Sequence, residues 1–150
     1  MKTNETNNKV VNSLNKVLSD LQVVYQNLRT MHWLVKGADF YMLHKLYEEF
    51  YTETAETVDE VAERVLTLGG VPLHTYADYL AQASLNVVTE VPAGRKSLHI
   101  VVENYTHLLQ EYRELLASAA EVSDDGTVDL FSGLISSTEK KLWMLNSTLS

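Results

Sequence analysis

The chain has 150 residues, of which 45% are hydrophobic and 21% charged, so it has the size and composition of a single folded domain. With 6 glycines and 2 prolines it lacks the turn residues typical of β-sandwiches and barrels. The absence of cysteine excludes disulfide scaffolds, thiolate zinc sites, iron–sulfur clusters and a cysteine nucleophile. A net charge of -8 repels nucleic acid and attracts cations.

The hydropathy of the chain and its first residues indicate a cytoplasmic protein with no membrane partner. No segment approaches the roughly 18 uninterrupted apolar residues that a membrane-spanning helix needs. Residues 1–10 are polar and contain no apolar stretch of a secretory signal. We therefore expect one cytoplasmic domain over residues 1–150, with a short polar tail over residues 1–8.

Two long helices are predicted in the first half of the chain. Apolar residues recur at steps of three and four over residues 10–28, which describes one stripe of a helix that ends near Gly37. A second stripe extends over residues 43–68, and the segment Gly69-Gly70-Val71-Pro72 ends it.

Two more helices are predicted after an irregular middle segment. Residues 72–92 break the helical pattern and leave room for one short helix over residues 76–83. A third stripe covers residues 98–119, and the turn at residues 123–127 provides an N-cap. The fourth helix follows over residues 128–145, with Trp143 assigned to the core.

The lengths of the connections predict the topology. Short loops make helices one and two, and helices three and four, antiparallel hairpins, whereas the middle connection can run the length of the bundle. An up-down bundle with a floppy middle loop is the alternative, but a structureless loop of about 20 residues is uncommon in a compact domain. The prediction is an all-α, ferritin-like four-helix bundle with one long crossover that carries a short helix between helices two and three.

The second helix carries two pairs of metal-ligating residues. His44 and Glu48, and then Asp59 and Glu63, are each four residues apart and share one arc of the helix at about 100° per residue. Imidazole with carboxylate suits iron, manganese or zinc. Each pair alone is also routine on an exposed helix. His32 lies on the apolar face of the first helix. It is either a ligand near His44 or a hydrogen-bonded core residue.

Distance along the second helix separates the two pairs. Glu48 and Asp59 lie eleven residues apart, about 16 Å at 1.5 Å per residue. Metal–ligand bonds of about 2.0–2.2 Å cannot join them within one chain. The chain therefore has either two weak sites or one site that a two-fold axis completes with residues of a second subunit. Apolar residues on the same arc favour the shared site.

A diiron centre inside one subunit is not expected. Four-helix bundles with such a centre carry Glu-x-x-His motifs on two helices. This sequence contains none, because His107 follows Glu103 by four residues rather than three.

The chain resembles the Dps family, the mini-ferritins also called DNA-binding proteins from starved cells, from about Val10 to Leu145. Three stretches carry the resemblance: Met31-His32-Trp33-Leu34-Val35-Lys36-Gly37, Leu43-His44-Lys45-Leu46-Tyr47-Glu48-Glu49-Phe50-Tyr51, and Val58-Asp59-Glu60-Val61-Ala62-Glu63-Arg64 with the following Leu68-Gly69-Gly70. The spacing of His32, His44, Glu48, Asp59 and Glu63 matches the ferroxidase motif of that family at every position.

The resemblance implies a homododecamer that oxidises Fe(II), preferably with hydrogen peroxide rather than O2, and stores the ferric mineral. It places His32, His44 and Glu48 of one subunit opposite Asp59 and Glu63 of its two-fold mate, around two iron ions. Zinc and manganese are expected competitors. Trp33 resembles the family tryptophan that supplies an electron and limits radical release, with ordinary packing as the alternative.

The resemblance also implies an acidic entry pore. Asp124 and Asp129, with Asp125 between them, lie at the turn before the fourth helix, where the family builds a three-fold channel. Three-fold symmetry would triple these charges into a cation funnel. The family often has a further acid where this chain has Gly133. Capping of the helix is the alternative role for the acidic turn.

The alternative function is DNA binding and protection with little ferroxidase activity. Members that bind DNA carry tails with several basic residues, whereas Met1–Lys9 contains two lysines and one glutamate and Asn146–Ser150 contains no basic residue. We expect direct DNA binding to be weak, since clustered Lys and Arg provide nonspecific affinity. A third interpretation is a helical bundle whose acidic residues serve only solubility and whose histidines are structural.

Overall fold

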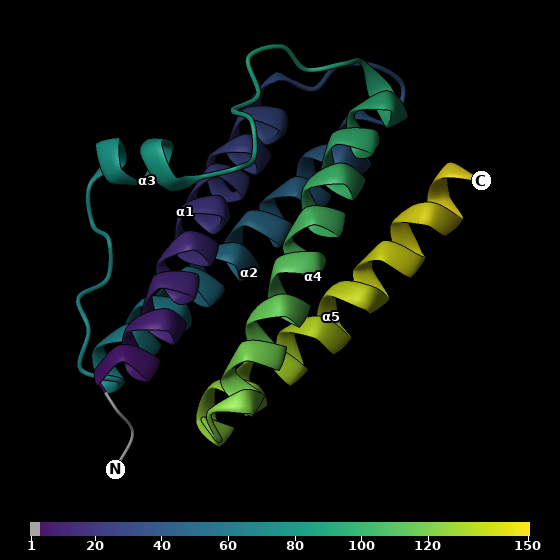
Figure 1. Cartoon of the computed structure of the whole chain (residues 1–150). Coiled ribbons are helices and arrows are strands. Elements are labelled where there is room, and N and C mark those ends of the chain that lie inside the picture. Colours follow the sequence, from purple (N-terminus) through teal and green to yellow (C-terminus); the bar gives the residue numbers. More distant parts are fainter. Residues whose placement is uncertain (1–3) are drawn as a thin grey trace.

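A computed structural model describes residues 4–150, and every regular element in that range is helical (Figure 1). The elements are α1 (Asn4–Leu34), α2 (Phe40–Thr67), α3 (Tyr76–Gln82), the 3₁₀ turn η1 (Gly94–Ser97), α4 (Leu98–Glu121) and α5 (Asp125–Leu149). The four long helices, with one crossover and its short helix, confirm the predicted fold class. Residues 1–3 of the expected tail lie outside the described residues, and the chain is helical from Asn4.

The apolar stripes of the long helices form the core. The α1 stripe is buried throughout, from Val10 to Leu28, and Leu43 and Tyr47 of α2 are completely buried beside it. In α5 the buried positions are Thr127, Phe131, Thr138 and Leu145. None of the described helices is long and apolar enough to cross a bilayer.

A tight connection brings the end of α1 back to the start of α2. Gly37 adopts φ +118°, a conformation that L side chains rarely adopt. A Cβ at Gly37 would lie 3.3 Å from the backbone nitrogen of Gly94. The N–H of Gly94 in turn donates to the carbonyl oxygen of Lys36 at 2.7 Å. This hairpin fixes the ends of α1 and α2 against η1.

Polar side chains of α1 hold the crossover against the bundle. Asn15 accepts from the N–H of Leu73, and Asn27 accepts from that of Val88. Between them, Asp20 Oδ1 accepts from the N–H groups of Ser84 and Leu85 at 2.7 and 2.9 Å. These bonds satisfy four backbone N–H groups in the irregular parts of the crossover.

Two expectations about the last helix need correction. The helix begins at Asp125 rather than Val128, because Asp124 is its N-cap. Trp143 is 66% exposed and does not belong to the core. It follows Phe131 by twelve residues, which places it about 120° away from the buried stripe at 100° per residue.

Asp124 joins the start of α5 to the end of α2. Its carboxylate accepts from the N–H of Thr127 at 3.3 Å and from the Thr127 hydroxyl at 2.6 Å, and it pairs with Arg64 at 2.7 Å. Burial alone would raise the pKa of Asp124, but these bonds from Thr127 and Arg64 outweigh it and hold the pKa below its usual value.

Replacing the cap tests this junction. We expect Asp124→Ala to reduce the free energy of unfolding by about 1–2 kcal/mol, the usual cost of a lost N-cap. Because the folded pKa is depressed, the stabilisation is fully present above the unfolded pKa of about 3.9 and is lost as the pH falls through the folded value. The measurement is thermal unfolding against pH at matched protein concentration.

The neighbouring carboxylate supplies the control. Asp125 is exposed, so Asp125→Ala should change stability by less than about 0.5 kcal/mol. Equal unfolding midpoints for Asp124→Ala and the parent at neutral pH would contradict the assignment of Asp124 as the cap.

Candidate metal centre

His32 and His44 meet across the α1–α2 hairpin. His32 is buried in the last turn of α1, and His44 lies in the second turn of α2. Their imidazole rings are stacked, with centroids 3.7 Å apart and an angle of 14° between the planes. The short connection between the helices therefore brings the two predicted nitrogen ligands together.

Reciprocal hydrogen bonds fix the orientation of both rings. Nδ1 of His32 lies 2.6 Å from the carbonyl oxygen of His44, and Nδ1 of His44 lies 2.8 Å from that of His32. A carbonyl oxygen only accepts, so both Nδ1 atoms carry a proton. In the neutral rings the lone pairs are then on Nε2. Metal-binding histidines commonly have this arrangement, in which a backbone carbonyl orients the ring.

Aromatic side chains surround the two histidines. Tyr51 lies edge-on to His32, with ring centroids 5.4 Å apart, and Phe40 stacks on His44 at 5.1 Å. Tyr25 contacts Tyr51 in turn at 6.0 Å. These ring contacts, together with the two hydrogen bonds, restrict rotation of the imidazoles.

The carboxylates lie on the exposed arc of α2. Glu48 is one turn after His44, whereas Asp59 and Glu63 lie near the far end of the helix, and all three side chains are exposed. Because α2 is continuous from Phe40 to Thr67, the distance of about 16 Å between the levels of Glu48 and Asp59 holds. Within residues 4–150, no three of the five predicted ligands come together. A site shared between subunits stays a prediction.

Trp33 projects outward beside the histidines. Its indole is exposed, and the guanidinium of Arg29 lies over it, 4.9 Å from the ring centroid. The same guanidinium lies 5.3 Å from the ring of Tyr25. The indole is therefore not part of the core of the described chain, and cation–π contact holds it in place.

The predicted pore acids differ in their surroundings. Asp124 is buried and bonded to Arg64 and Thr127 as described above, whereas Asp125 and Asp129 are exposed. Asp129 therefore lies at the surface, whereas Asp124 serves as the cap of α5.

One group of ligand-type side chains was not predicted from the sequence. Asp20, His107 and Glu111 bring their nitrogen and oxygen atoms within 4.8 Å of one another. His107 and Glu111 are four residues apart on α4, a spacing that could have been noticed, but nothing in the sequence links them to Asp20 on α1.

Comparison with known proteins agrees with this fold. The family model described as ferritin-like domain matches residues 11–150. A Dps protein of Vibrio cholerae O1, described as a ferritin-like diiron-carboxylate protein, superposes with a TM-score of 0.96 at 38% identity, covering 100% of this chain and 98% of that one. The chain belongs to the Dps family of ferritin-like proteins.

Other Dps proteins are similarly close. The DNA protection during starvation protein of Porphyromonas gingivalis is 40% identical over 138 residues, which cover 92% of this chain and 87% of that protein. DNA protection during starvation protein 2 of Bacillus anthracis is 35% identical over 144 residues, covering 96% and 99% of the two chains.

The stacked histidines should contribute to stability as well as to binding. His44→Ala removes one ring of the stack and one hydrogen bond, so we expect the free energy of unfolding to fall by about 1–3 kcal/mol. Glu48→Ala removes an exposed side chain, and its effect should stay below about 0.5 kcal/mol. Thermal unfolding of the metal-free variants measures both, and equal losses would contradict a structural role for the histidine pair.

Proposed function

We propose that the chain is a ferroxidase and iron store that protects against oxidative stress. Fe(II) is its substrate, oxidised at centres shared between two subunits, and the ferric mineral collects inside a shell of twelve subunits. The observation that carries the proposal is the division of the ligands on α2. The imidazoles of His32 on α1 and His44 on α2 lie with orientated rings near the start of α2, and a carboxylate pair lies exposed near its end.

A two-fold axis would complete the site. Antiparallel α2 helices of two subunits bring the His44 end of one to the Asp59 end of the other, and the same contact forms twice by symmetry. Each pair of subunits then has two centres, each with His32, His44 and Glu48 from one chain and Asp59 and Glu63 from its mate.

Exposed apolar residues on the same arc support a second subunit there. At 100° per residue with His44 at zero, Tyr41 lies at about 60° and Leu66 at about 40°, between the ligand positions. Tyr41 is 78% exposed and Leu66 57% exposed in the single chain. Both side chains would be covered if α2 of a second subunit packed along this arc.

The donor set fits iron. Carboxylate oxygens bind Fe(II) and Fe(III) and can bridge two ions, while two imidazoles favour iron over calcium, with zinc and manganese as competitors. Few protein ligands leave positions for water and peroxide.

Two Fe(II) ions each give one electron to H2O2, the O–O bond breaks, and two protons complete two waters. O2 is the slower oxidant. An electron from Trp33 would reduce any radical formed when only one Fe(II) reacts.

The acidic turn would admit iron to the cavity, with Asp129 at the surface of a three-fold pore and Asp124 behind it.

Direct DNA binding is proposed to be weak. Several basic residues are already engaged with carboxylates: Lys16, Arg64, Arg95, Arg113 and Lys141. The net charge of -8 adds repulsion. A gel shift at low salt tests this part of the proposal.

Replacing the acid pair tests the ferroxidase. We expect Asp59→Ala and Glu63→Ala each to slow peroxide-dependent oxidation of Fe(II) by about 100-fold, at the top of the range known for residues that only support a metal ligand. The readout is the ferric absorbance after Fe(II) loading without oxygen and addition of H2O2. Sedimentation of the same samples establishes the particle size.

Glu60→Ala is the matched control, because Glu60 is exposed on the same helix but lies about 100° away from Asp59. It should oxidise Fe(II) at the parental rate. Parental rates in both acid-pair variants, with helix content and particle size unchanged, would overturn the site assignment.

A further inference from the structure

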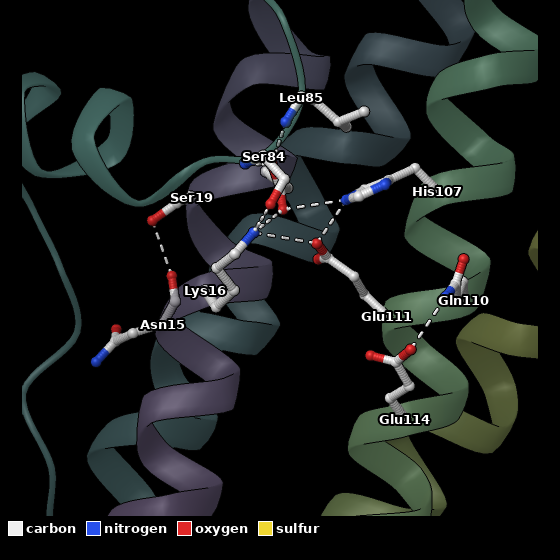
Figure 2. Close-up of polar contacts among 10 residues, drawn as sticks. Asn15, Lys16, Ser19, Ser84, Leu85, His107, Gln110, Glu111 and Glu114 are labelled. Carbon is white, nitrogen blue, oxygen red and sulfur yellow. Dashed lines mark hydrogen bonds and ion pairs between the residues drawn. The ribbon is translucent and has the colours of Figure 1, made fainter.

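A second group of metal-ligating side chains lies between α1 and α4, beneath the crossover. Asp20 belongs to α1. His107 and Glu111 project from successive turns of α4 toward Lys16, as Figure 2 shows. Asp20 precedes His32 by twelve residues, about 18 Å along the helix. The group is therefore separate from the histidine pair and from the arc of α2.

The distances in this group approach those of a metal site. Nε2 of His107 lies 2.7 Å from Oε1 of Glu111 and 3.6 Å from Oδ2 of Asp20. Bonds of about 2.0–2.2 Å place the ligands of a tetrahedral ion about 3.4 Å apart. Small side-chain movements would therefore bring all three atoms to one ion.

A cation already lies against the two carboxylates of the group. The ammonium of Lys16 lies 2.7 Å from Oδ2 of Asp20 and 3.2 Å from Oε1 of Glu111. Its side chain is partly exposed, on a flexible stem. An open cleft of about 810 Å³, lined by Lys16, Ser84, His107 and Glu111 among others, adjoins the group. The ammonium can swing into this cleft, and an ion can enter from it.

The other oxygen of Glu111 is left without a partner. Its Oε2 atom is buried and accepts no hydrogen bond from the described residues, and the side chain is only 12% exposed. A buried carboxylate oxygen without a partner carries a desolvation cost that a metal bond would remove. This feature is independent of the contacts among Asp20, His107 and Lys16.

The charges of the group are also unbalanced. Two carboxylates face one ammonium. A divalent ion would balance both carboxylates without the ammonium.

We propose that Asp20, His107 and Glu111 form a binding site for a divalent transition-metal ion of the zinc type, which displaces the ammonium of Lys16. One imidazole nitrogen with carboxylate oxygens favours Zn²⁺ or a similar ion over Ca²⁺ and Mg²⁺. The bound ion would join α1 directly to α4 at the residue that anchors the crossover. The site does not depend on the proposed ferroxidase.

Zinc titration of the full chain tests the site. Metal-free protein carrying Asp59→Ala and Glu63→Ala, which removes the acid half of the proposed ferroxidase centre, is titrated with Zn²⁺ by calorimetry. We expect a site that is lost in Glu111→Gln and in His107→Gln. Co²⁺ in place of Zn²⁺ should give a visible absorption band that is lost in the same variants.

Lys16→Met separates a metal site from a purely structural ion pair, because it keeps every ligand and removes the competing cation. Zinc should bind about tenfold more tightly, equivalent to about 1.4 kcal/mol. Glu114→Gln, an exposed carboxylate beside the same cleft, is the control and should bind as the parent does. Equal zinc binding in the parent and Glu111→Gln, or no tightening in Lys16→Met, would overturn the proposal.

Discussion

The length of α2 is the constraint on which the functional interpretation depends. A straight helix carries His44 and Glu48 near one end and Asp59 and Glu63 near the other, about 16 Å apart between Glu48 and Asp59. No rearrangement of side chains brings these ligands to one ion. If they act together, the second half of the site must come from another subunit. The catalytic site would then form only when subunits associate.

The fold supplies a rigid half-site for such an assembly. The hairpin around Gly37 returns α2 beside the end of α1, and the reciprocal bonds between His32 and His44 hold both rings. Nearer the N-terminus of α1, Asn15, Asp20 and Asn27 bind the backbone of the crossover. The carboxylates on the outer arc of α2 are exposed. Asp20 has two roles, because its second oxygen also faces Lys16 and His107.

Periodicity was sufficient to predict the helices, and the spacing of residues on α2 was sufficient to select the candidate ligands. The orientation of the histidines could not be predicted, because backbone carbonyls provide it. Asp20, His107 and Glu111 were missed since 87 residues separate Asp20 from His107 and only the packing of α1 on α4 joins them. Trp143 lies outside the core because it is about 120° around α5 from the buried Phe131.

Co-assembly of two inactive variants tests the shared site most directly. One chain carries His32→Ala, His44→Ala and Glu48→Ala, and the other carries Asp59→Ala and Glu63→Ala. Random pairing makes half of the dimers mixed, and each mixed dimer has one intact centre, so roughly a quarter of the parental Fe(II) oxidation should return. Mixed shells as inactive as either variant alone would contradict a centre shared between subunits.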